Sequence, residues 1–482
     1  MYDIRPVGYV TGLLVLVLGL TMLVPMAVDI YYDNGHWPAF FESAIITALT
    51  GGLVALACAN GVGQRLSIQQ TFLLTTGVWT ALPLFGALPF MFGEGSELFV
   101  DALFEAMSGM TTTGSTVLTG LDTRPEGILM WRGMLQWFGG VGIIVVAMVF
   151  LPELRVGGMQ IFKSEAFDTM GKILPRAGEI AQQISVIYLG LTVICAITYA
   201  ALGMSAFEAI VHSMTTVSTG GFSTTDQSFG AFQGPMEYAA SIFMILASLP
   251  FVRFVQLLAG SARPIFVDTQ VRAYLATILT LVVFFSVYRL VVNGDHLEHG
   301  FREAIFNVTS IISGTGYASV DYQEWGAIAV VVFFFIGLIG GCAGSTACSI
   351  KVFRYQLLLA SISTQLRRLY APHGVFEPRY EGRKVSEEVL SSVMAFFVMF
   401  FVSFGVVSIL LALTGLDFVT SVSGAATALA NIGPGLGPEI GPAGTFTNLN
   451  DTAKWILTVS MLVGRLELMA VFVLFTTQFW RG

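Results

Sequence analysis

Long apolar runs are the feature that most constrains the fold of this chain. About 20 consecutive apolar residues let a helix cross the hydrocarbon core of a bilayer, and runs of that length recur from end to end. Of the 482 residues, 55% are hydrophobic and 11% charged, whereas soluble domains carry roughly a quarter charged residues. A spanning segment must satisfy its backbone hydrogen bonds internally, so the pattern predicts an all-α polytopic membrane protein.

Ten segments are predicted to cross the membrane. The first two form an N-terminal pair, and the other eight form four further pairs. Between the members of each later pair lies a shorter apolar segment followed by Gly, Ser and Thr, which fits a re-entrant pore helix. The predicted spans are roughly 7–30, 39–60, 70–92, 127–151, 179–203, 236–260, 269–293, 326–350, 388–414 and 453–478.

The short segments are internal repeats. DALFEAMSGMTTTG (101–114), EAIVHSMTTVSTGG (208–221) and EAIFNVTSIISGTG (303–316) each begin with an acidic residue and Ala and end on Gly thirteen positions after the acid. A looser fourth copy, TSVSGAATALANIG (420–433), lacks the acid. Four copies predict four pseudo-symmetric helix–pore-helix–loop–helix repeats around one pore.

The repeats predict five units. These are an N-terminal transmembrane helix pair (1–66), pore repeat 1 (67–160), pore repeat 2 (161–264), pore repeat 3 with a gating loop and a cytoplasmic basic segment (265–384), and pore repeat 4 (385–482).

The segments TTTGST, STGGFST, SGTGYAS and NIGPGLG have the composition of an ion filter. Backbone carbonyls can replace the hydration shell of a cation without adding charge, and the C-terminal ends of helices favour a cation. Glycine permits the dihedral angles that turn carbonyls into a lumen. One such segment alone resembles a helix-capping turn, but four at matching places favour a filter.

The distribution of Lys and Arg predicts that both termini are cytoplasmic. Most of these residues fall on the side of the N-terminus. The opposite side is acidic, which reflects either ordinary solvation of loops or a negative vestibule that concentrates cations. The basic residues in the predicted outer segments are Arg124, Arg132, Arg289, Arg302 and Lys454.

Beyond the repeats, four motifs carry a resemblance to a known family. They are MLQWFGGVGIIV (134–145), IGGCAGSTACSIKVFR (339–354), NIGPGLG (431–437) and MLVGRLELMAVFVLF (461–475). With them the chain resembles, over essentially its whole length, the TrkH-type subunits of the Trk/Ktr/HKT superfamily of potassium uptake proteins. The resemblance implies a protein of the bacterial inner membrane that transports potassium, without an organic cofactor. It also implies a homodimer with one pore per subunit and a cytoplasmic nucleotide-binding regulator of the TrkA type.

The resemblance also implies which residues form the filter. Sodium-preferring members of the family tend to carry Ser at the first filter glycine, so Gly114 favours potassium. The implied filter residues are Thr112, Thr113, Gly114, Thr219, Gly220, Gly221, Gly314, Thr315, Gly316, Asn431, Ile432 and Gly433.

A glycine-rich stretch interrupts the predicted span 326–350. Gly337, Gly340, Gly341 and Gly344 each weaken a helix by about 1 kcal/mol relative to Ala. Close helix packing is one explanation, and the resemblance implies another, an intramembrane gating loop beneath the filter. The sequence departs from the family at three places that are often Gly, namely Ala347, Cys348 and Ser349.

Arg465 lies near the middle of the last predicted span, where a charge is costly unless it meets water or a partner. Glu467 points to another face of a continuous helix, so a pore position that opposes cations is favoured, as the family's gate arginine implies. The polar, basic segment from Lys351 to Lys384 is predicted to dock the regulator.

Two other classes of function are weighed. A proton- or sodium-coupled potassium symporter is the alternative, although no chain of buried acids or histidines typical of proton relays stands out. An enzyme is disfavoured because His36, His212, His296, His299 and His373 are scattered and no nucleophile–base pair or metal-ligand cluster appears. The chain has no basic tail that would bind nucleic acid.

Overall fold

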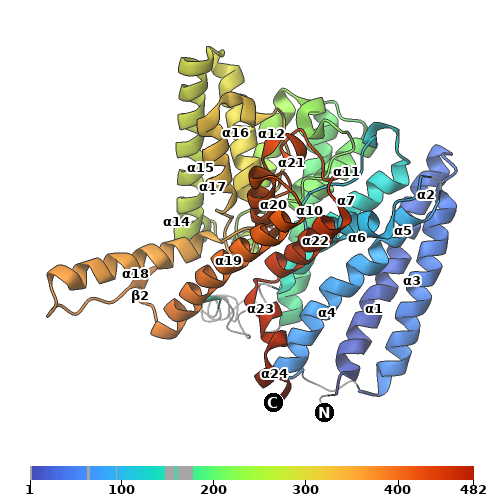
Figure 1. Cartoon of the computed structure of the whole chain (residues 1–482), viewed down its shortest axis with the longest axis horizontal. Helices are drawn as coiled ribbons and strands as arrows, with labels where there is room; N and C mark the ends of the chain where they lie inside the picture. Colours follow the sequence, from blue (N-terminus) through green and yellow to red (C-terminus); the bar gives the residue numbers. More distant parts are fainter. Residues whose placement is uncertain (1–2, 62–65, 94, 147–157, 160–176, 482) are drawn as a thin grey trace.

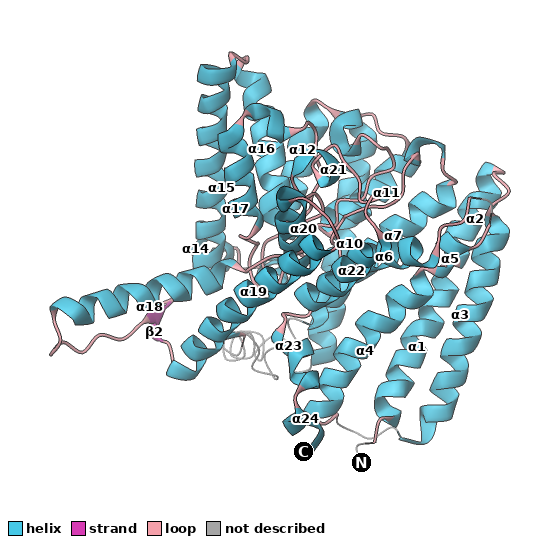
Figure 2. Cartoon of the chain, viewed as in Figure 1, coloured by secondary structure: helices cyan, strands magenta, loops and turns pink. Residues whose placement is uncertain are grey.

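The structure is a computed structural model of the chain. In its described part, seven helices are long and apolar enough to cross a membrane, and two bent helix pairs raise the number of candidate spans to nine. The predicted all-α membrane fold is confirmed: within these residues the strands are the two-residue β1 (Arg379–Tyr380) and β2 (Arg383–Lys384), as Figure 2 shows. The described residues are 3–61, 66–93, 95–146, 158–159 and 177–481.

The N-terminal helix pair lies at one side of the bundle (Figure 1), and its first member is divided into α1 and α2. Helix α1 packs against α3 and α4. A Cβ added at Gly12 or Gly51 would collide with the backbone of the facing helix, so these glycines permit the close approach. The helices are α1 (Arg5–Thr21), α2 (Leu23–Tyr32) and α3 (Trp37–Cys58), with the 3-10 turn η1 (Ala59–Gly61).

The buried carboxylate of Asp29 fastens this pair to the first repeat. One oxygen accepts hydrogen bonds from the Gly127 backbone N–H (2.6 Å) and from the Asn34 amide (2.7 Å). The other lies 3.2 Å from Nδ1 of His36. Asn34 also donates to Glu126 (2.9 Å). A fully buried carboxylate therefore has its partners on both sides of the helix interface.

Each of the four repeats contains a first helix, a short helix and a second helix, and the second helix of the third repeat, which ends at Gly337, is too short to be one of the nine candidate spans. The first helices are α4 (Ile68–Gly86, followed by α5, Leu88–Met91), α10 (Ala177–Leu202), α15 (Thr269–Tyr288, followed by the π-helical turn η6, Arg289–Asn293) and α19 (Glu387–Leu413). The short helices are α6 (Phe99–Met110), α11 (Ala206–Val217), α16 (Leu297–Ser313) and α20 (Phe418–Ala430). The second helices begin as α7 (Glu126–Val145), α12 (Pro235–Ala247), α17 (Ala327–Gly337) and α22 (Asp451–Arg465).

The second helix of each repeat packs against the short helix of the next. Helix α7 contacts α11, α12 contacts α16, α17 contacts α20, and α22 returns to α6. The four repeats thus close into a ring, with the short helices inside it. The predicted boundary at 160/161 lies outside the described residues. Short connecting elements are α14 (Arg263–Val267), α21 (Gly437–Ile440), η2 (Leu121–Thr123), η5 (Ser228–Phe232) and η7 (Tyr322–Trp325).

Two second helices are sharply bent, so the predicted spans 236–260 and 453–478 are each divided between two helices. Helix α12 meets α13 (Phe251–Leu258) at 91°, and Pro250, which cannot continue a helix, lies at the break. Helix α22 meets α23 (Met469–Phe472) at 102°. There Glu467 and Leu468 have φ of 61° and 49°, which ends the helix without Gly or Pro. The chain continues through η8 (Val473–Phe475) and α24 (Thr477–Arg481).

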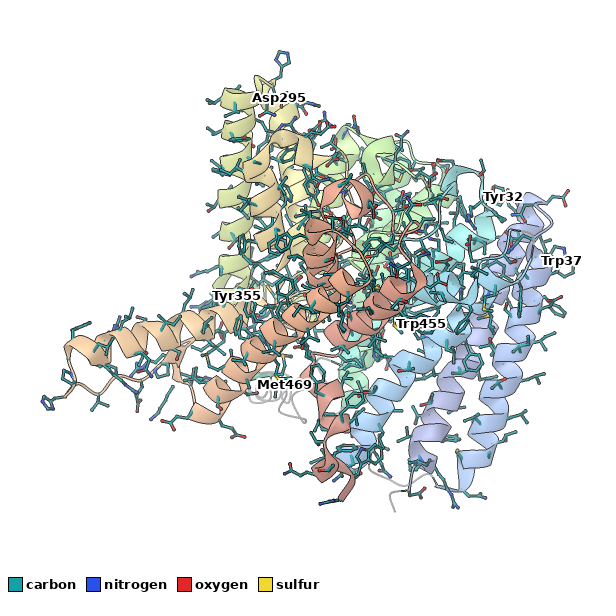
Figure 3. All side chains as sticks on the ribbon, viewed as in Figure 1. Tyr32, Trp37, Asp295, Tyr355, Trp455 and Met469 are labelled. Carbon is teal, nitrogen blue, oxygen red and sulfur yellow. The ribbon has the colours of Figure 1, made fainter. Side chains whose placement is uncertain are left out.

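Helix α18 (Val352–Tyr370) leaves the bundle as an arm, drawn in orange in Figure 1. It starts where the loop after α17 ends, and the β1–β2 hairpin leads the chain back into α19. At its base lies Tyr355, labelled in Figure 3, whose hydroxyl donates to the carbonyl of Leu338 (2.9 Å). The N- and C-termini lie on one side of the molecule (Figure 1).

The attachment of the N-terminal pair can be tested at Asp29. Asp29→Asn replaces one carboxylate oxygen with an NH2 group that faces hydrogen-bond donors. We expect a loss of about 1–3 kcal/mol in stability, measured by thermal unfolding of the purified protein in detergent. Asp33→Asn is the matched control because Asp33 is exposed and Asn tolerates its left-handed φ of 53°. Equal stability of the two variants would contradict the assigned role.

Candidate functional site

The short helices end inside the bundle, and the segments that follow share one backbone pattern. We call the stretches 112–114, 219–221, 314–316 and 431–433 the filter segments. Their first residues, Thr112, Thr219, Gly314 and Asn431, have φ of 52°, 52°, 76° and 53°. Their third residues, Gly114, Gly221, Gly316 and Gly433, have φ of 87°, 79°, 80° and 105°. Alternation of left-handed and ordinary φ lets successive carbonyls face one side, which regular helices and strands do not permit.

The four filter segments surround one axis. A Cβ added at Gly114 would overlap the carbonyl oxygen of Gly220 in the second segment, and one at Gly221 would overlap that of Thr315 in the third. One at Gly316 would overlap the oxygen of Ile432. One at Gly433 would lie 3.0 Å from the oxygen of Thr113, back in the first segment. The structure therefore brings all twelve sequence-predicted filter residues together in a closed ring.

Side chains behind the ring tie neighbouring segments to each other. The Asn431 amide donates to Oγ1 of Thr113 and to the carbonyl of Met461, both at 2.9 Å. Oγ of Ser115 donates to the carbonyl of Gly433 (2.7 Å). These contacts join the first and fourth repeats, which are farthest apart in sequence.

A polar hollow lies on one side of the ring, and Gly114, Gly221, Gly316 and Gly433 line it. Asp226 is the single acidic residue among the described residues that line the hollow. Arg132 also lines it. Three other acidic side chains on the predicted outer side are paired with arginines: Glu97 with Arg124 (2.7 Å), Asp295 with Arg289 (2.6 Å) and Glu298 with Arg302 (3.1 Å). The hollow is therefore built from hydroxyls and backbone rather than from a belt of carboxylates.

On the opposite side, residues 338–351, which we call the inner loop, close against the ring. Sγ of Cys348 lies 3.4 Å from Oγ1 of Thr112 in the first segment. A Cβ added at Gly314 in the third segment would lie 2.9 Å from Cβ of Cys348. The side chain of Cys348 is thus in contact range of two facing segments.

The inner loop is fastened to the bend between α12 and α13. The Cys342 N–H donates to the carbonyl of Ser248 (3.0 Å), and the Phe251 N–H donates to that of Gly344 (2.9 Å). Gly341 packs against Ser248, and Gly340 packs against the carbonyl of Cys348. The glycines predicted to weaken a helix therefore allow close backbone contacts within the loop.

Arg465 lies beside the inner loop at the end of α22 and is almost fully buried. Its Nη1 donates to Sγ of Cys348 (2.7 Å), and its Nη2 lies 3.5 Å from the carbonyl of Gly139. Glu467, in the bend after α22, is paired with Arg354 of α18 instead. Arg465 thus contacts the loop rather than a buried acid.

Two features of the site escaped prediction. Gln136 donates to the carbonyl of Gly220 (2.6 Å) from behind the ring, whereas the motif that contains it, 134–145, carries only a family resemblance. The break at 248–250 holds the inner loop, and Pro250 was the signal that could have located it. Lys351 and Arg354, at the start of the segment predicted to dock the regulator, are buried.

The fold and the ring define the chain as a polytopic membrane transport protein with four pore loops on one axis. The model of the TrkH family, described as "Cation transport protein", matches residues 36–481, and the chain belongs to this family. The prediction of a transport protein rather than an enzyme is thereby confirmed.

Relatives match over nearly the whole chain. The Trk system potassium uptake protein TrkI of Halomonas elongata is 41% identical over 478 residues, covering 99% of this chain and 97% of the relative. The Trk system potassium uptake protein TrkH of Escherichia coli K12 is 37% identical, with 99% of each chain covered. The crystal structure of the potassium transporter TrkH from Vibrio parahaemolyticus superposes with a TM-score of 0.91 at 33% identity, covering 99% of each chain.

Proposed function

We propose that this chain is a potassium uptake subunit of the bacterial inner membrane, with both termini in the cytoplasm. The observation that carries the proposal is the closed ring of four filter segments, in which the carbonyls of Thr113, Gly220, Thr315 and Ile432 each meet the glycine at the third position of the preceding segment. Such carbonyls can replace the water around a dehydrated potassium ion. The relatives, which are named potassium uptake proteins, support potassium as the transported ion.

The inner loop and Arg465 form the gate in this proposal. Cys348 lies against the first and third filter segments, and Arg465 holds it from behind. A guanidinium at this depth raises the electrostatic barrier for a cation. Opening requires the loop to leave the ring, which breaks its contact with Arg465.

The arm supports the proposed homodimer and the proposed TrkA-type cytoplasmic regulator. Exposed apolar side chains of α18 recur at the spacing of one helix face, which suits a partner helix. Arg367 and Arg368, in its last turn, are exposed and offer a basic surface. The apolar residues of this face are Leu359, Ile362, Leu366 and Leu369.

Flux into proteoliposomes tests the proposed function. The purified protein should carry potassium and rubidium in preference to sodium, with a reversal potential that follows the potassium gradient alone. A reversal potential that also moves with a proton or sodium gradient would indicate the coupled symporter. Absence of any potassium-selective flux in protein activated by its regulator would overturn the proposal.

Gly114→Ser tests the filter. The added side chain collides with the carbonyl of Gly220, and φ of 87° is strained for Ser. We expect the potassium-over-sodium permeability ratio to fall more than the total flux. Gly294→Ser is the matched control because Gly294 also has positive φ (75°) but open space around it. An unchanged permeability ratio in Gly114→Ser would remove Gly114 from the filter.

Arg465→Ala tests the gate. It removes both the positive charge and the hydrogen bond to Cys348, so resting potassium flux per assembled protein should rise without the regulator. Shortening the loop between Gly340 and Gly344 should act similarly. The two changes together should give less than the sum, because both act through one contact. Reduced flux per assembled protein in Arg465→Ala would exclude the gate assignment.

Charge reversal on the arm tests regulator docking. Replacing Arg367 and Arg368 by Glu should weaken binding of the regulator in pull-down experiments, most at low ionic strength. Replacing Arg263 and Arg272 by Glu makes the same charge change at exposed positions off the arm. Equal binding by both double variants would place the contact elsewhere.

A further inference from the structure

Gln136 is a fully buried polar residue of α7 that reaches the filter ring from another element. Its Nε2 donates to the carbonyl of Gly220 (2.6 Å), and its Oε1 accepts from the backbone N–H of Phe222 (3.1 Å). One amide thus spans the second filter segment on both sides of Gly221. The Gln136 amide offers the second filter segment one donor and one acceptor, as the backbone of a neighbouring strand would.

The second filter segment differs from the others at its middle position. The middle residues of the other three segments carry side chains, namely Thr113, Thr315 and Ile432. Oγ1 of Thr113 bonds to Oγ1 of Thr111 (2.7 Å), and that of Thr315 bonds to Oγ of Ser313 (2.7 Å). In the second segment the middle residue is Gly220, which has no side chain to anchor it.

The Gln136 amide occupies the space that a side chain at Gly220 would fill. The three atoms nearest to a Cβ added at Gly220 are Cδ, Oε1 and Nε2 of Gln136, and they would overlap it. The φ of Gly220 lies outside the left-handed region, so the backbone does not itself demand glycine. A side chain at position 220 and the amide of Gln136 therefore exclude each other.

We propose that Gln136 is a specificity-determining residue that replaces the missing side chain of the second filter segment. The inference rests on the proposed potassium filter. The carbonyl of Gly220 is one of the four ring oxygens, and a hydrogen bond from Gln136 fixes its direction. A ring oxygen released from this bond can move inward around a smaller ion, so the site loses discrimination against sodium.

Gln136→Leu removes both hydrogen bonds while keeping much of the volume. We expect the potassium-over-sodium permeability ratio to fall about threefold to tenfold, the size of one hydrogen bond's contribution. Trp137→Phe is the matched control, since Trp137 is the next residue of α7 and donates to Thr192 (3.0 Å) away from the ring. That control should keep the wild-type permeability ratio.

Exchanging residues at positions 220 and 136 tests whether the Gln136 side chain replaces the missing side chain at Gly220. Gly220→Thr alone should abolish selective flux, because its side chain collides with Gln136. Gly220→Thr combined with Gln136→Ala removes the colliding atoms and gives the segment the middle residue of the first and third segments. Selective flux should return in the double variant.

The outcomes separate this inference from the proposed function. A wild-type protein without potassium selectivity overturns the proposed function itself. A selective wild type with an unchanged ratio in assembled Gln136→Leu overturns only the role of Gln136. If Gln136→Leu does not assemble, the exchange decides, since a double variant that assembles but is no more selective than Gly220→Thr contradicts the inference.

Discussion

Non-helical backbone in the middle of a membrane bundle is the constraint on which the structure depends. Lipid offers no partner for a free carbonyl, so such backbone persists only where protein or a water-filled path surrounds it. Here the filter segments meet each other across glycines that leave no room for a Cβ. The short helices, the bracing amides of Gln136 and Asn431, and the packing of each second helix on the next repeat all hold that ring in place.

A series of direct contacts joins the arm to the ring. Arg354 in the first turn of α18 pairs with Glu467, which lies in the left-handed bend after α22. The guanidinium of Arg354 also stacks on Phe396 at 3.8 Å. Two residues before Glu467, Arg465 holds Cys348 against Thr112. Arg354 of the arm and Arg465 beside the proposed gate are thus joined through the short stretch of chain from Arg465 to Glu467.

The fourfold plan could be predicted from the sequence because an apolar short segment ending on Gly recurs four times, and in three of the copies an acidic residue stands thirteen positions before that Gly. The predicted filter residues came from the family resemblance, and the structure brings all twelve together in one ring. What escaped prediction depends on contacts between repeats. Nothing in the neighbourhood of Gln136 indicates that its partner is Gly220, 84 residues away. The bend at Glu467 and Leu468 has no Gly or Pro signal, and its left-handed φ is stabilised by tertiary partners such as Arg354.

The cyclic packing of second helices on successive short helices has a consequence for biogenesis. The ring closes only when α22, in the fourth repeat, reaches α6 in the first. Until then the carbonyls of the earlier segments lack their last neighbours, and Thr113 lacks the Asn431 amide. During synthesis, therefore, the first three repeats form an incomplete ring in the bilayer until the fourth repeat is inserted. The translocon or neighbouring helices must shield that incomplete ring until then.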